Sequence, residues 1–321
     1  MLNIAKISSK TMKRLILSYL FAVSCMAIFA QQDPLITHIF FNKAYQNPAF
    51  AGQQGEVCAN LINRQQWVGL DGAPQTTMFS LNAPVRLFGT NSGIGIQISD
   101  DRLGFEKNFT GNIQYAYILD LPSGNLSFGI QLGVLNKAFE GAWQTPEVDA
   151  ANDFAIPQSG DQDMVFDMGL GIVYALDNLY LGFSATHLTQ PDFKFSASQI
   201  PYVKRHYYLM TGYKFSLSNS PFEFTPNLII QYDGGSPQII MNVNMLYNKK
   251  LWGGVTYRTL DALDLNIGLE LFNGIKIGYA YGLNLSKLIK TNGGSHEIMI
   301  GYCFNFEFGK IPQKYRSVRF L

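Results

Sequence analysis

The 321-residue sequence has few charged residues, no strong charge of either sign and no long hydrophobic run beyond its first 30 residues. Charged residues make up 15%, whereas a soluble domain usually carries about 25%. A disordered chain is excluded because 47% of the residues are hydrophobic. A net charge of +1, without a basic run after the N-terminus, argues against a nucleic-acid partner. After residue 30 no stretch reaches the roughly 18 apolar residues of a membrane-spanning helix.

The N-terminus reads as a secretory signal peptide over residues 1–30. Lys13 and Arg14 precede an apolar run that ends at Ala30 and is followed by polar residues. Translation starting at Met12 would give the same signal, and cleavage before Cys25, as in a lipoprotein, is the alternative. Removing residues 1–30 takes four basic residues and no acid, so 24 − 4 = 20 basic residues face 23 acidic ones. The mature chain is then nearly neutral and keeps two of the three cysteines.

Alternation of apolar with polar or glycine residues dominates the sequence after residue 55, and this pattern predicts β-strands with two unlike faces. About fourteen strands of ten to fourteen residues are expected, near residues 56–68, 75–85, 92–102, 106–120, 125–139, 163–176, 178–189, 204–217, 222–233, 236–248, 250–260, 262–273, 275–287 and 295–308.

The fold class predicted from these strands is all-β, a transmembrane antiparallel barrel of about 14 strands. The strands are as long as a tilted membrane strand requires, and their number is even. With a signal peptide, this predicts an outer-membrane barrel over residues 55–309, with its apolar face toward lipid. A periplasmic segment (residues 31–54) would precede it and a basic tail (residues 310–321) would follow. A soluble β-sandwich is the alternative.

Loop lengths indicate an orientation. The two long connections, 140–162 and 190–203, fall at the same end if the strands alternate in direction. Outer loops of such barrels are long and periplasmic turns are short. The N- and C-termini are therefore expected in the periplasm.

The two remaining cysteines are expected beside each other. Cys58 lies in the first predicted strand and Cys303 in the last, and these strands must pair to close the barrel. Parity places both side chains in the lumen. In an oxidising compartment they can form a disulfide; the alternatives are side-by-side packing, or two small fillers at separate inward positions.

Enzymatic motifs are not evident. The four histidines are scattered, and His296-Glu297 lacks the second histidine of a zinc-protease helix. His187 and His206 flank one loop without an indicated serine partner. Asp161 and Asp163 fit a solvated loop better than a cation site. We therefore expect no catalytic residue, no cofactor and no metal.

Three motifs in the mature chain carry a family resemblance. They are Gln31-Gln32-Asp33-Pro34, then Asn47-Pro48-Ala49-Phe50-Ala51-Gly52, then Arg64-Gln65-Gln66-Trp67-Val68-Gly69-Leu70-Asp71-Gly72-Ala73-Pro74. Further matches are Asp167-Met168-Gly169-Leu170-Gly171, Asn178-Leu179-Tyr180-Leu181-Gly182, His187-Leu188 and Arg316-Ser317-Val318-Arg319-Phe320-Leu321. Together these segments resemble the PorP/SprF family of type IX secretion outer-membrane proteins.

The resemblance implies a function without catalysis. Members of this family serve export or surface attachment of cargo, including an adhesin in gliding bacteria. The implied partners are the ring lipoproteins of the secretion system, a peptidoglycan-anchored lipoprotein and secreted cargo with a C-terminal signal, together with outer-membrane lipid. The alternative is a porin or FadL-like channel for small or hydrophobic solutes, which a barrel alone supports equally.

Motif residues are the interaction candidates: Asn47, Pro48, Gly52, Arg64, Trp67, Gly69, Gly72, Pro74, Arg316 and Arg319. Arg64 is expected in the lumen, paired with a carboxylate, and Trp67 at the lipid interface. Gly72 is expected at positive φ in a tight turn. Asn47 is expected to be extended because it precedes proline, so that residues 31–54 would form an ordered strap at or inside the periplasmic mouth. All of these can also be purely structural.

Overall fold

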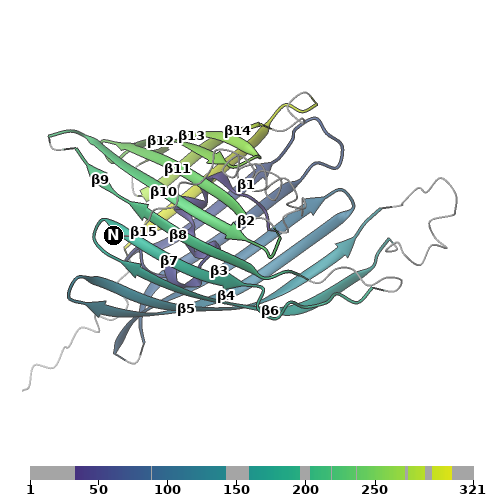
Figure 1. Cartoon of the computed structure of the whole chain (residues 1–321), viewed down its shortest axis with the longest axis horizontal. Helices are drawn as coiled ribbons and strands as arrows, with labels where there is room; N and C mark the ends of the chain where they lie inside the picture. Colours follow the sequence, from purple (N-terminus) through teal and green to yellow (C-terminus); the bar gives the residue numbers. More distant parts are fainter. Residues whose placement is uncertain are drawn as a thin grey trace, which may run out of the picture.

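The computed structural model describes residues 33–87, 89–141, 159–195, 203–217, 219–235, 237–271, 274–285 and 291–305. The signal peptide, most of the loop 140–162 and the tail with Arg316 and Arg319 lie outside these residues. Three short 3-10 helices precede fifteen strands (Figure 1). Their bounds are η1 Thr37–Phe41, η2 Lys43–Tyr45, η3 Pro48–Phe50, β1 Val57–Gln65, β2 Gln75–Leu87, β3 Thr90–Leu103, β4 Glu106–Leu121, β5 Gly124–Phe139, β6 Gln162–Ala175, β7 Leu179–Thr186, β8 His206–Tyr213, β9 Phe215–Ser216, β10 Phe222–Tyr232, β11 Pro237–Tyr247, β12 Leu251–Arg258, β13 Ala262–Glu270, β14 Ile275–Asn284 and β15 Ser295–Phe304.

The strands form one closed antiparallel ring. Sequential neighbours pair, β8 pairs with β10, and β15 pairs with β1 to close the sheet. β9 has two residues and lies beside β10, so fourteen long strands make the ring. The predicted 14-stranded barrel is confirmed. Among the described residues no helix has the length and apolar character needed to cross a membrane.

The predicted faces are confirmed as well. In β13, Leu265, Ile267 and Leu269 are exposed on the outside, whereas Asp264 and Asn266 are buried inside. The same alternation runs around the ring, so a belt of Leu, Ile, Val, Phe and Tyr covers the outer face. Because the lumen side carries Asn, Gln, Ser, Asp and Arg, this polarity suits a barrel in lipid.

The two ends of the barrel differ. The start of β1 and the last described residues of β15 lie at one end, called here the terminal end. The loop 66–74 after β1 lies at the other end, together with the end of β5, the start of β6, the end of β7 and the start of β8; this is called the long-loop end (Figure 1). The strand ends that the two long connections join therefore lie at one end of the barrel, as the sequence analysis expected.

A disulfide between Cys58 and Cys303 joins the first and last strands. The two residues are direct cross-strand partners, and their Cα atoms are 4.1 Å apart. The predicted closing register is confirmed, and of the alternatives left open the structure shows the disulfide. Parity puts both side chains on the inner face, and their similar distances from the terminal ends of β1 and β15 put them at the same height.

Residues 33–55, called here the strap, lie inside the ring. They contact β13 and β15 on one side and β4 to β7 on the other. Figure 1 shows this N-terminal segment surrounded by strands. Ile39, Ala44 and Ala49 are buried between the strap and the inner wall. The lumen is thus filled by the chain's own N-terminal segment over much of its height.

Candidate functional site

The Asn47-Pro48 motif anchors the strap to the wall formed by β6 and β7. The buried Asn47 amide donates to the carbonyls of Ile172 and Phe183, at 3.3 and 3.2 Å. Its side-chain oxygen accepts from the backbone N–H of Ala49 at 3.0 Å and so caps η3. Asn47 is extended (φ −143°, ψ 107°), as predicted before proline, and Pro48 opens η3 without a lost donor. The Asn47 side chain therefore caps η3 and at the same time binds the strap to the barrel wall.

Glycines on the inner wall make room for this motif. A Cβ on Gly93 would overlap the backbone of Ala51, one on Gly129 the backbone of Pro48 and Ala49, and one on Gly171 the side chain of Asn47. Strand glycines often mark a close backbone approach, which is their role here. Gly52 adds the reciprocal fit: its φ is +71°, and a Cβ there would strike Gly93 and Ala83.

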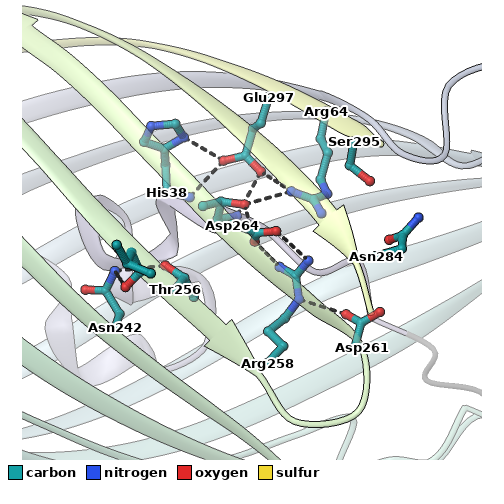
Figure 2. A network of polar contacts seen from close by, with 12 residues as sticks. His38, Arg64, Asn242, Thr256, Arg258, Asp261, Asp264, Asn284, Ser295 and Glu297 are labelled. Atoms are coloured by element: carbon teal, nitrogen blue, oxygen red, sulfur yellow. Dashed lines mark hydrogen bonds and ion pairs between the residues drawn. The ribbon is translucent and has the colours of Figure 1, made fainter. Parts of the chain in front are cut away.

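Toward the long-loop end, the strap binds a buried charge network (Figure 2). The Glu297 carboxylate of β15 accepts from the backbone N–H groups of Thr37 and His38, each at 2.8 Å. It also accepts from Arg64 of β1 at 2.9 Å and contacts His38 Nδ1 at 2.7 Å. Arg64 and Glu297 are 2% and 1% exposed, and their Cα atoms are cross-strand partners. The expected luminal pairing of Arg64 with a carboxylate is confirmed.

A second buried ion pair joins the first through Thr37. Arg258 of β12 contacts Asp264 of β13 at 2.7 Å, and Asp261 at 2.8 Å (Figure 2). The Thr37 hydroxyl donates to Asp264 at 2.8 Å and accepts from Arg64 at 2.8 Å. One hydroxyl can fill both roles. The strap thus links two arginine–carboxylate pairs from four strands.

The first described residue, Asp33, joins a separate cluster at the long-loop end. Its carboxylate contacts His187 Nε2 at 3.1 Å and accepts from the Tyr208 hydroxyl at 2.7 Å. His206 Nδ1 lies 3.7 Å away. His187 follows β7 and His206 begins β8, so Asp33 and the start of β1 lie at opposite ends of the barrel. The strap therefore reaches beyond the mouth where the sequence analysis placed it, because these side chains provide a binding position across the lumen.

Charge complementarity fixes the protonation of this cluster. Burial alone would raise the pKa of the Asp33 carboxyl, but His206 and His187 hold it well below its usual range. Burial alone would lower the pKa of His187, yet Asp33 and Asp167 together raise it to about 10. His187 Nδ1 lies 2.7 Å from Asp167. With both of its nitrogens on carboxylates, His187 is not placed to activate a serine.

The loop after β1 corrects one prediction. Trp67 was expected at the lipid interface, but its indole N–H donates to Asn284, an inward residue, at 3.2 Å. β1 ends at Gln65, and Trp67 takes a positive φ of 52°, which turns the side chain over the mouth of the lumen. A period-two pattern could not show this, since the strand had already ended.

The rest of this loop is a tight turn. Gly72 has a φ of +71°, as predicted, and Gly69 has a φ of +97°. The carbonyl of Leu70 accepts from the Ala73 N–H at 3.2 Å and closes this turn, and the carbonyl of Pro74 accepts from the Gln66 N–H at 2.9 Å at the base of the loop. Both glycines are exposed, so the loop from Val68 to Ala73 is accessible from the long-loop end.

A cavity of 370 Å³ lies at the terminal end, between the strap and β7. The Lys43 ammonium stands over the Tyr180 ring, 4.0 Å from its centroid, and 5.5 Å from the Phe50 centroid. Burial lowers the pKa of Lys43 to about 8. Lys214 also lines the cavity. Its lining is therefore amphipathic, with aromatic rings and amines.

Comparisons with solved structures find other barrels. The CymD monoaromatic hydrocarbon channel is 12% identical with a TM-score of 0.50, and the match covers 79% of this chain and 88% of that one. The Ralstonia pickettii toluene transporter TbuX is 12% identical with a TM-score of 0.49, covering 82% and 93%. The Acinetobacter baumannii outer-membrane protein Omp33 is 9% identical with a TM-score of 0.45, covering 78% and 99%. At these identities the likeness concerns the fold alone.

Sequence comparison is more specific. No curated protein matches the chain. The family model described as type IX secretion system membrane protein PorP/SprF matches residues 28–302, which include the strap and nearly the whole ring. The chain, an outer-membrane β-barrel, therefore belongs to the PorP/SprF family of type IX secretion membrane proteins.

Proposed function

We propose that this barrel is a component or accessory of the type IX secretion system that binds secretion partners and supports export or surface attachment of specific cargo. The family match carries the proposal. The strap supports it, because a lumen crossed by buried hydrogen bonds and ion pairs is built to hold its own segment in place. We propose no catalytic role for the barrel.

The partners follow from the family. They are the ring lipoproteins of the secretion system, a peptidoglycan-anchored lipoprotein and cargo with a C-terminal signal. Of the interaction candidates, Gly69 and Gly72 lie in the accessible loop 68–73. Asn47, Pro48, Gly52 and Arg64 position the strap instead, so we assign them an internal role. Arg316 and Arg319 lie outside the described residues and remain candidates for an acidic partner or lipid head groups.

A channel for small or hydrophobic solutes is the second candidate. The fold shared with the CymD channel and the amphipathic cavity beside Lys43 favour it. The two functions predict different phenotypes, since a channel is defined by what passes through it and an accessory by what binds to it.

Deletion of the gene is expected to abolish surface display of specific cargo while leaving the uptake of small aromatic solutes unchanged. The tagged barrel, cross-linked in cells and purified in detergent, is expected to bring down secretion-ring proteins and cargo. A variant with β15 deleted, which cannot close the ring, serves as the misfolded control. Loss of solute uptake with normal cargo display would instead establish the channel.

We further propose that the long-loop end faces outside and that the chain's β1 and β15 begin and end on the periplasmic side. Cysteines introduced by Asp71→Cys and Ser123→Cys test this, because both residues are exposed and lie at opposite ends. The native pair is disulfide-bonded and should not react. In intact cells a membrane-impermeant maleimide is expected to label Asp71→Cys alone. Labelling of Ser123→Cys alone would reverse the orientation.

A further inference from the structure

The cluster around Asp33 brings three side chains of metal-ligating type close together. One carboxylate oxygen of Asp33, one ring nitrogen of His187 and one of His206 all lie within 4.8 Å of one another. They come from three separate parts of the chain: the strap, the end of β7 and the start of β8. A cation with bonds of about 2.0–2.1 Å holds such ligands a little over 3 Å apart. The Asp33 carboxylate lies 3.1 Å from His187 Nε2 and 3.7 Å from His206 Nδ1, near that spacing.

His206 provides the independent observation. Its ring is fully buried, yet neither ring nitrogen has a hydrogen-bond partner. Its Nδ1 faces the Asp33 carboxylate at 3.7 Å, beyond hydrogen-bonding distance. A buried imidazole without hydrogen-bond partners destabilises the fold, so such a group needs an explanation. A ligand between His206 and Asp33 supplies one.

The surroundings of His187 match those of a metal-binding histidine. Its Nε2 faces Asp33 and its Nδ1 contacts Asp167 at 2.7 Å. Histidines that bind metals commonly donate their other N–H to a carboxylate, which fixes the ring and strengthens the ligand. Asp167 is held in turn, since its second oxygen accepts from the Thr189 hydroxyl at 3.0 Å. Hydrogen bonds therefore fix both His187 and the carboxylate that orients it.

We propose that Asp33, His187 and His206 bind a divalent cation of the zinc class, with Asp167 as the residue that positions His187. One carboxylate and two imidazoles are ligands that zinc accepts, usually with a further open position. Two neutral histidines and the carboxylates Asp33 and Asp167 give a charge that a divalent cation balances. Binding displaces the proton between His187 and Asp33.

A cation at this site would hold the strap in place, and this role does not depend on the proposed secretion function. Asp33 belongs to the strap, whereas the two histidines border the β7–β8 connection. The cation would therefore fasten the N-terminal end of the strap to the barrel wall, fourteen residues before the Asn47 anchor (47 − 33 = 14).

Zinc titration of the full-length barrel tests the proposal. The mature protein, without a histidine tag, is purified in detergent, stripped with a chelator and titrated with zinc chloride in a calorimeter. One zinc per chain is expected. Asp33→Asn and His206→Ala should abolish saturable binding, and Asp167→Asn should weaken it about 10- to 100-fold. X-ray absorption should show nitrogen and oxygen ligands.

His296→Ala is the matched control, because His296 lies in β15 and contacts Tyr279. It is expected to bind zinc like the unmodified chain. Heat-modifiable migration on gels verifies that each variant is a folded barrel, and Asp33→Asn, outside the strands, covers the case in which His206→Ala does not fold. Absence of zinc binding by the unmodified barrel, or equal binding by Asp33→Asn, overturns the proposal.

Discussion

Glu297→Ala is expected to destabilise the barrel by about 3–5 kcal/mol, because it leaves the buried Arg64 without its carboxylate. The same change frees the backbone N–H groups of Thr37 and His38, which have the Glu297 carboxylate as acceptor. Urea unfolding in lipid vesicles, followed by tryptophan fluorescence, measures the loss. The strap should also become accessible to protease near η1.

Glu270→Ala is the matched control for this variant. Glu270 is paired with Lys276 at 3.8 Å, and the side chains are 36% and 26% exposed. An ion pair of this kind contributes about 0–1 kcal/mol. Similar losses from the two variants would show that the Glu297 network does not hold the strap.

Gly129→Ala is expected to release the middle of the strap from the wall. The new methyl group would overlap the backbone of Pro48 and Ala49, which cannot rotate away as a side chain can. Overpacking of this kind costs about 1–3 kcal/mol, and the Asn47 hydrogen bonds are lost in addition. We expect higher ion conductance in planar bilayers, because the lumen opens as the strap moves.

Gly111→Ala provides the comparison in the neighbouring strand β4. A Cβ at Gly111 meets only the side chains of Phe109 and Val134, at 3.7 and 3.8 Å. Its conductance and stability should equal those of the unmodified barrel. If Gly129→Ala conducts no better than Gly111→Ala, the glycine contacts do not retain the strap.

The ring could be predicted from the sequence because its signals are local. Each strand repeats every two residues, and a barrel has one inside and one outside, so parity places every strand residue. The same reasoning brought Cys58 and Cys303 together, since the first and last strands must pair. The predicted strand near residues 178–189 was too long, because the alternation continues past Thr186, where β7 ends.

The interior could not be predicted in the same way. Contacts of the strap join residues more than 200 positions apart, such as Thr37 with Glu297, and no periodicity marks them. Gly129 and Gly171 looked like ordinary small strand residues until the strap was placed against them. Strand parity could have placed His206 and Asp167 on the inner face at one end. It would have turned His187 outward, because His187 lies just past β7 at a positive φ of 55°, and Asp33 reaches the cluster only through the path of the strap.

The seam between β1 and β15 bears on lateral exit from the barrel into the membrane. Cys58 with Cys303 fastens this strand pair covalently near one end, and Arg64 with Glu297 fastens it near the other. The two fastenings lie six positions apart along β1 (64 − 58 = 6), about 20 Å at 3.3 Å per residue. These two strands cannot part sideways while the disulfide is intact. A lipid or polypeptide that leaves the lumen laterally would have to pass between another pair of strands. A molecule that does not leave laterally must pass through one of the two mouths.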